Sequence, residues 1–166
     1  MNAKGRKAAA ILLAVTLTSA AGASLAASDS SFAGHYTTAS LSVQEQTAGN
    51  LLNSDRARYG LAPLVIDPEL CRIARIKSQD MRDNQYFAHT SPTYGDVRSM
   101  LRRFGYAYTA SGENIAHHAT IEKAQAAFLS SPGHRRNIMS GTYTKVGMGA
   151  AIDAQGYVYL TQIFVR

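Results

Sequence analysis

Three side chains suited to binding or catalysis stand outside the amphipathic pattern of the chain: His89, Glu113 and His134. Each lies in a stretch that we expect to connect two packed elements, and loops held by a rigid scaffold are where binding groups collect. The sequence holds no HExxH, CxxC or nucleophile-elbow motif, so no local spacing identifies a metal or catalytic site. Only the fold can bring these three residues together.

His134 is expected in the first turn of a short helix, because Ser131 and Pro132 suit its N-cap and first position. The positive end of the helix dipole disfavours imidazolium, which predicts a neutral His134 with a free lone pair near neutral pH. A metal ligand must be neutral in this way. The alternative is that His134 only bonds a backbone carbonyl.

Glu113 and His89 each have a structural alternative as well. A carboxylate beside the apolar Ile115 is costly unless it is paired or bound. Glu113 could form a salt bridge to Arg56, Arg135 or another arginine, and His89 could cap the turn that follows it. Taken singly, neither residue defines a site.

His117 and His118 are adjacent, so in an extended segment they point to opposite sides and cannot chelate one ion together. We expect both to be solvated. Tyrosines flank the candidate stretches and would suit a carbohydrate or peptide ligand, although tyrosine also packs at the edge of a core. They are Tyr86, Tyr94, Tyr106, Tyr108 and Tyr143.

Helices are expected first and strands last. Apolar spacing, caps and stops predict four helices ahead of the short one, and alternating apolar residues around a glycine turn predict a hairpin. The expected helices run from Leu41 to Tyr59, from Asp67 to Asn84, from Asp96 to Phe104 and onward from Thr120, and the hairpin strands cover 145–152 and 157–165. This order indicates an α+β fold with helices packed on an antiparallel sheet.

The N-terminus has the order of a secretory signal: basic residues, then an apolar run, then small residues. We expect residues 1–27 to be a signal peptide cleaved after Ala26 or Ala27, residues 28–40 to be a flexible lead-in, and residues 41–166 to form one domain. An uncleaved membrane anchor is the alternative. The prediction is a secreted, extracellular protein with no stable membrane insertion after cleavage.

Charge and cysteine content narrow the function further. Three of the 17 basic residues lie in the expected signal, which leaves 14 against 11 acidic residues. That surplus is too small to argue for nucleic acid. Cys71 is the only cysteine, so no internal disulfide can form, and we expect it to be a small buried filler rather than a partner in a bridge between chains.

Six motifs, taken in order, resemble the CAP superfamily of cysteine-rich secretory proteins, antigen 5 and plant pathogenesis-related proteins, in its disulfide-free bacterial, SCP-like branch. The resemblance covers the chain from about Val43 to Val165. The motifs are GLAPL at 60–64, SQDM at 78–81, FAHTSP at 87–92, GENIA at 112–116, SPGHR at 131–135 and VGMG at 146–149.

The resemblance implies a three-layer α-β-α sandwich with a central cleft built from two histidines and two glutamates. His89, Glu113 and His134 correspond to three of these residues, and Ser130 falls at the position of the second glutamate. The tetrad is therefore short of one carboxylate. Two imidazoles and one carboxylate still match a three-ligand zinc site with one open position.

The family does not specify one activity, so function has to be argued from the site. The first hypothesis is a monomeric extracellular binding module whose cleft of His89, Glu113, His134 and Ser130 takes a divalent metal or a small polar ligand. Its partner could be a small polar molecule, a lipid or a cell-envelope component. The second is a zinc-dependent hydrolase, for which no free carboxylate base is visible. The third is a purely structural envelope protein.

Overall fold

The structure is a computed structural model that describes residues 40–166. The predicted signal peptide and residues 28–39 of the predicted lead-in lie outside the described residues. The predicted order, with helices first and strands last, is interrupted by two strands that lie between helices. In chain order the elements are α1 (Val43–Arg58), β1 (Val65–Ile66), α2 (Pro68–Asp83), α3 (Val97–Arg103), β2 (Ser111–His118), α4 (Ile121–Ser130), α5 (Pro132–Ile138), β3 (Lys145–Ile152) and β4 (Val158–Val165).

The predicted helices and the hairpin are confirmed, and their boundaries follow from capping. The Asp67 carboxylate accepts hydrogen bonds from the backbone N–H groups of Glu69 and Leu70, each at 3.0 Å, and so begins α2 with Pro68 at its first turn. α1 begins with a capping box between Ser42 and Glu45.

Two strands were not predicted. β1 is only two residues long, and β2 holds the GEN stretch that we expected to be a loop. The sheet order is β1-β3-β4-β2, with β1 parallel to β3 and the other pairs antiparallel. The sheet is therefore antiparallel except at one short edge, and β2 is the strand at the opposite edge.

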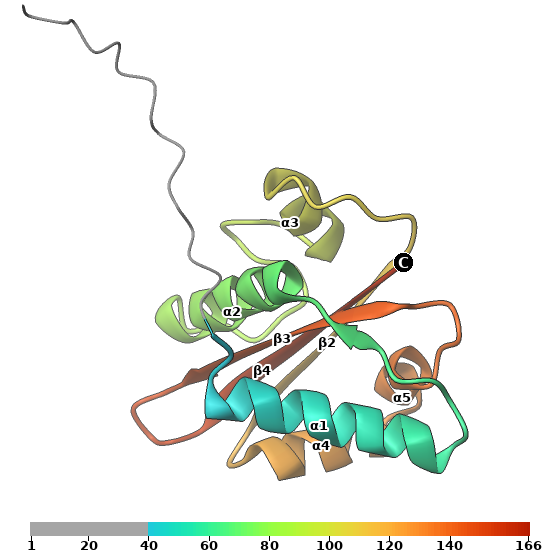
Figure 1. Ribbon diagram of the computed structural model, residues 1–166. Coiled ribbons are helices and arrows are strands. Elements are labelled where there is room, and N and C mark those ends of the chain that lie inside the picture. The colour runs from blue at the N-terminus through green and yellow to red at the C-terminus, as the bar shows by residue number, and fades with distance from the viewer. Residues whose placement is uncertain (1–39) are drawn as a thin grey trace, which may run out of the picture. The chain divides into compact units, whose positions relative to one another are not determined.

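Helices cover both faces of the sheet, as the predicted α-β-α sandwich requires. Figure 1 shows α2 and α3 on one side and α1, α4 and α5 on the other. Each face has its own apolar core: Leu70, Ile73 and Met100 pack with Ile163 on the α2 side, while Leu52, Phe128 and Phe164 belong to the core on the α1 side. The sheet is thus buried on both faces, which makes it a rigid platform.

α2 lies in direct contact with β3 because two strand positions lack side chains. A Cβ atom added to Gly147 would overlap the backbone carbonyl of Leu70, and one added to Gly149 would overlap the backbone of Ala74 and Arg75. These glycines let the helix approach closer than any other residue would allow. They set the position of α2 over the sheet.

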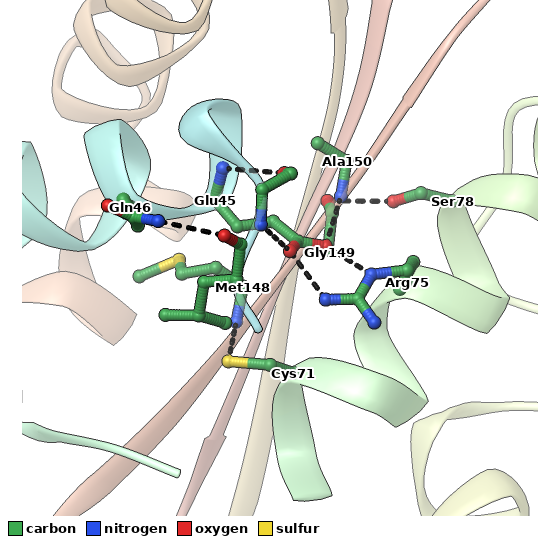
Figure 2. Close-up of polar contacts among 10 residues, drawn as sticks. Glu45, Gln46, Cys71, Arg75, Ser78, Met148, Gly149 and Ala150 are labelled. Atoms are coloured by element: carbon green, nitrogen blue, oxygen red, sulfur yellow. Dashed lines mark hydrogen bonds and ion pairs between the residues drawn. The ribbon is translucent and has the colours of Figure 1, made fainter. Parts of the chain in front are cut away.

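Polar groups join α1, α2 and β3 beside this contact (Figure 2). Glu45, fully buried, accepts two hydrogen bonds from Arg75, at 2.7 and 2.6 Å. The hydroxyl of Ser78 donates to the carbonyl of Gly149 at 2.9 Å. These bonds fix the orientation of α2 relative to α1 and β3. α2 carries residues of the site described below.

Cys71 is buried, as predicted for a filler. Its sulfur accepts a hydrogen bond from the N–H of Met148 at 3.2 Å, also seen in Figure 2. Burial raises the pKa of Cys71 to about 11, so its thiol stays protonated near neutral pH. Cys71 therefore has a packing role between α2 and β3.

Candidate functional site

The site is built around the edge strand β2. Side chains alternate along a strand, so neighbouring residues face opposite sides of the sheet. Asn114 bonds Gln162 on the side of α4 and α5, and Glu113 therefore faces the side of α2. This corrects the expectation that Glu113 lies on a loop: it is fixed in a strand by pairing with Ile163 of β4.

Glu113 is bonded to His89, and not to an arginine. The Nδ1 atom of His89 lies 2.7 Å from Oε1 of Glu113. The His89 side chain is 58% exposed, whereas that of Glu113 is 3% exposed. The other carboxylate oxygen, Oε2, is buried without a hydrogen-bond partner. A polar atom in this state is costly unless a bound group satisfies it.

The pairing changes the charge of His89. Its hydrogen bond to Glu113 holds the pKa of His89 above the ordinary value, against burial and the charge of Lys77, which both lower it. An imidazole next to a carboxylate is favoured in its protonated form. The pair therefore places an exposed imidazole, with its protonated form favoured, in front of a buried carboxyl group.

Lys77 lies beneath this pair and holds the loop that carries His89. It is fully buried, and its ammonium donates to the carbonyls of Ala88 at 2.8 Å and His89 at 3.0 Å, and to the hydroxyl of Tyr86 at 3.2 Å. Burial lowers the pKa of Lys77, while the charge of Glu113 raises it. Lys77 thus positions the His89 backbone, and its positive charge partly balances the charge of Glu113.

Asp80, one helical turn later, holds the other end of the same loop. Ser91 donates to its carboxylate at 2.6 Å, and Tyr86 also donates to it. Burial acts to raise the pKa of Asp80, but the bonds from Ser91 and Tyr86 outweigh it and the pKa is lowered. The stretch around His89 is therefore fastened to α2 at two points, which sequence spacing alone did not reveal.

His134 approaches β2 from the opposite side. It lies in α5, its ring packs 5.2 Å from that of Phe128, and its carbonyl accepts from Asn114 at 3.1 Å. Burial first, and the charge of His89 second, lower the pKa of His134. The lowered pKa agrees in direction with the neutral form predicted from the sequence, and burial is its largest cause.

A chain of buried polar side chains fixes Asn114 and thereby α5. Asn114 bonds Gln162, Gln162 bonds Gln125 at 2.9 Å, and Gln125 bonds Asp55 of α1 at 2.7 Å. Each of these amides is buried and satisfied. A network of this kind rigidifies a core because breaking any member leaves the others unpaired.

The candidate residues thus gather around one stretch of β2 but do not form a ready-made metal centre. Within residues 40–166, no three His, Cys, Asp or Glu side chains lie together as an ion would require. His89 and Glu113 engage each other, and His134 lies around the strand from them. Ser130 is exposed and its hydroxyl donates to Ala126 in its own helix at 2.9 Å. The zinc site stays a prediction.

A hollow of about 300 Å³ lies elsewhere, against the second half of α2. Its lining includes Gln79, Asp83 and Tyr94, and none of the candidate site residues. The polar groups of Asp80 that reach it are already bonded within the protein. The hollow therefore lies apart from the candidate residues around β2.

The fold and the residues around β2 define a CAP domain, and the chain belongs to the cysteine-rich secretory protein family, whose model it matches over residues 50–164. Among solved structures, it is similar to an extracellular protein containing an SCP domain from Bacillus anthracis. That similarity has a TM-score of 0.69 and 35% identity, over 74% of this chain and 40% of the other.

Curated relatives agree with this assignment. The uncharacterized protein YkwD of Bacillus subtilis is 45% identical over 111 residues, which are 66% of this chain and 43% of that protein. The uncharacterized membrane protein YlbC of the same organism is 34% identical, over 70% of this chain and 33% of that protein. The chain spans less than half the length of either relative.

One further likeness concerns the fold alone. An outer surface protein from Borrelia burgdorferi has a TM-score of 0.67 at 16% identity, over 73% of this chain and 90% of that protein. In the part of the chain that the structure describes, no helix has the length and apolar character needed to cross a bilayer.

Proposed function

We propose that this CAP domain is an extracellular binding module whose polar site, formed by His89, Glu113 and His134, takes a small polar ligand or a divalent cation. The carrying observation is the Oε2 atom of Glu113, which is buried and has no partner. Such an atom suits a ligand that brings a positive charge or a hydrogen-bond donor. The exposed ring of His89 is the group that an incoming ligand meets first.

Extracellular action is supported by the sequence order at the N-terminus and by the similarity to the B. anthracis protein described as extracellular. The proposed signal peptide is cleaved after Ala26 or Ala27, and the mature domain acts as a monomer. A hydrolase has less support, because the one buried carboxylate of the site is bonded to His89 and leaves no separate general base.

A zinc ion is the first probe, because the two imidazoles and the carboxylate are donors that zinc uses. We expect Zn²⁺ to raise the free energy of unfolding by about 2.7 kcal/mol at a hundredfold excess over its dissociation constant. His134→Ala should remove most of this gain, and acid should weaken it because the imidazoles protonate. Urea unfolding with and without ZnCl₂ measures the effect.

His117→Ala is the matched control. It also removes one imidazole, and His117 lies in β2 with Glu113 but is not part of the polar site. Its response to zinc should equal that of the wild-type domain. Equal stabilisation of wild type and His134→Ala would contradict the zinc proposal. The proposal of a small polar ligand would then be the part to pursue.

A further inference from the structure

Four aromatic rings gather on the surface next to the polar site. We call them the ring patch: Phe87, His117, Tyr157 and Tyr159. His117 stacks on Tyr159 with ring centroids 4.0 Å apart, and the ring of Tyr157 lies 5.5 Å from His117. Phe87 lies 6.4 Å from His117 and 6.5 Å from Tyr159.

The ring patch faces solvent. Phe87 is 52% exposed and Tyr157 is 46% exposed, although both are large apolar rings. His117 is held in place by Asp153, whose carboxylate lies 2.7 Å from its Nε2 atom. His117 is exposed, as expected, and the bond to Asp153 adds a fixed position that the sequence did not indicate. A fixed set of exposed rings with polar edges is an arrangement that a folded domain does not need for its own core.

The patch continues the polar site along β2. Glu113 and His117 are four residues apart on one strand, so both point to the α2 side at a spacing of roughly 13 Å. Phe87 stands two residues before His89, so the loop that brings His89 to Glu113 also brings Phe87 to His117. One extended ligand could contact both places.

We propose that the ring patch is a carbohydrate-binding subsite for an uncharged pyranose glycan. The C–H groups on one face of a pyranose ring are apolar and stack on aromatic rings, while its hydroxyls need polar partners at the ring edges. The second imidazole nitrogen of His117 and the tyrosine hydroxyls supply such partners, while Asp153 is occupied by His117 and by the N–H groups of Gln155 and Tyr157. A lipid chain would need a continuous apolar groove, and a protein partner a larger apolar area than four rings provide.

This inference assigns a ligand class to the ring patch. It rests on the proposed function only where it takes the ring patch and the polar site to contact one ligand. The probe is the N-acetylglucosamine tetramer, titrated into the domain and followed by NMR of the aromatic side chains. We expect binding that weakens at least tenfold in Phe87→Ala and in Tyr157→Ala. Both residues are exposed, so both variants should fold, which circular dichroism checks.

Tyr59→Ala is the control, because Tyr59 is equally exposed, at 56%, but lies at the end of α1 away from the patch. It should bind the tetramer like wild type. Absence of binding by the wild type, or equal affinity in Tyr157→Ala and Tyr59→Ala, would overturn the subsite. Glu113→Gln separates the two proposals: loss of tetramer binding there, with retention in Tyr157→Ala, would place the sugar in the polar site instead.

Discussion

Replacement of Gly149 by alanine is expected to unfold the domain or nearly so. The added Cβ would overlap the backbone carbonyl of Ala74 and the backbone nitrogen of Arg75. Neither group can turn away as a flexible side chain can, so α2 must move off β3. Overpacking a core costs about 1–3 kcal/mol, and a backbone collision costs more. That is a large share of the roughly 5–15 kcal/mol that stabilises a domain.

Gly133→Ala is the matched control for this substitution. Gly133 lies in α5, and a Cβ added there meets nothing within 4 Å. Alanine should be neutral or stabilise the helix by up to ~1 kcal/mol. Urea unfolding followed by circular dichroism compares the two variants. A midpoint for Gly149→Ala equal to that of wild type would show that α2 is not held in contact with β3.

Lys77→Met is expected to disorder the loop that carries His89. The methionine side chain keeps most of the volume but removes the ammonium that bonds the carbonyls of Ala88 and His89. It also removes a buried positive charge that interacts with the charge of Glu113. Removing one partner of a buried polar cluster costs about 3 kcal/mol.

A structural loss alone would lower stability without changing the loop selectively. We therefore expect Lys77→Met to speed amide hydrogen exchange, relative to wild type, more in residues 86–91 than in the rest of the domain. Lys123→Met, at an exposed position of α4, should leave both stability and exchange unchanged. If Lys77→Met speeds exchange over wild type by the same factor throughout the domain, Lys77 is not a positioning residue for this loop.

The helices were predictable from sequence because their signals are local. Asp67 with Pro68 begins α2, and Gly156, whose φ is 83°, supports the predicted hairpin turn. β2 escaped prediction because its burial comes from both faces: residues 113–116 are all buried, so no alternation marks it as a strand. Glycine at 112 and the polar pair that follows further disguised it.

The site was predictable only in its membership. The resemblance to the CAP superfamily selected His89, Glu113 and His134, but not how they meet. The partner of Glu113 depends on where Lys77 and Asp80 hold the loop after α2, and those contacts join residues far apart in sequence. The ammonium of Lys77 donates to three oxygens, and no sequence signal indicated this.

His89 also makes stability depend on pH in a defined direction. A histidine whose folded pKa is raised contributes stability that is fully present below its unfolded value of 6.5 and is lost as pH rises through the folded pKa. His134, whose folded pKa is lowered, acts in the opposite sense, and its contribution is lost as pH falls below 6.5. The two losses therefore lie on opposite sides of pH 6.5, and stability falls away from this pH in both directions as far as these two histidines determine it.

The most direct test of the central claim, that His89, Glu113 and His134 form one charge-coupled site, is an NMR pH titration of the imidazoles in metal-free buffer. In the wild-type domain, His89 should titrate above 6.5 and His134 below it. Glu113→Gln should bring the pKa of His89 down toward 6.5, while Glu122→Gln, at an exposed position of α4, should not. A His89 that titrates at or below 6.5 in wild type, or that ignores Glu113→Gln, would contradict the account.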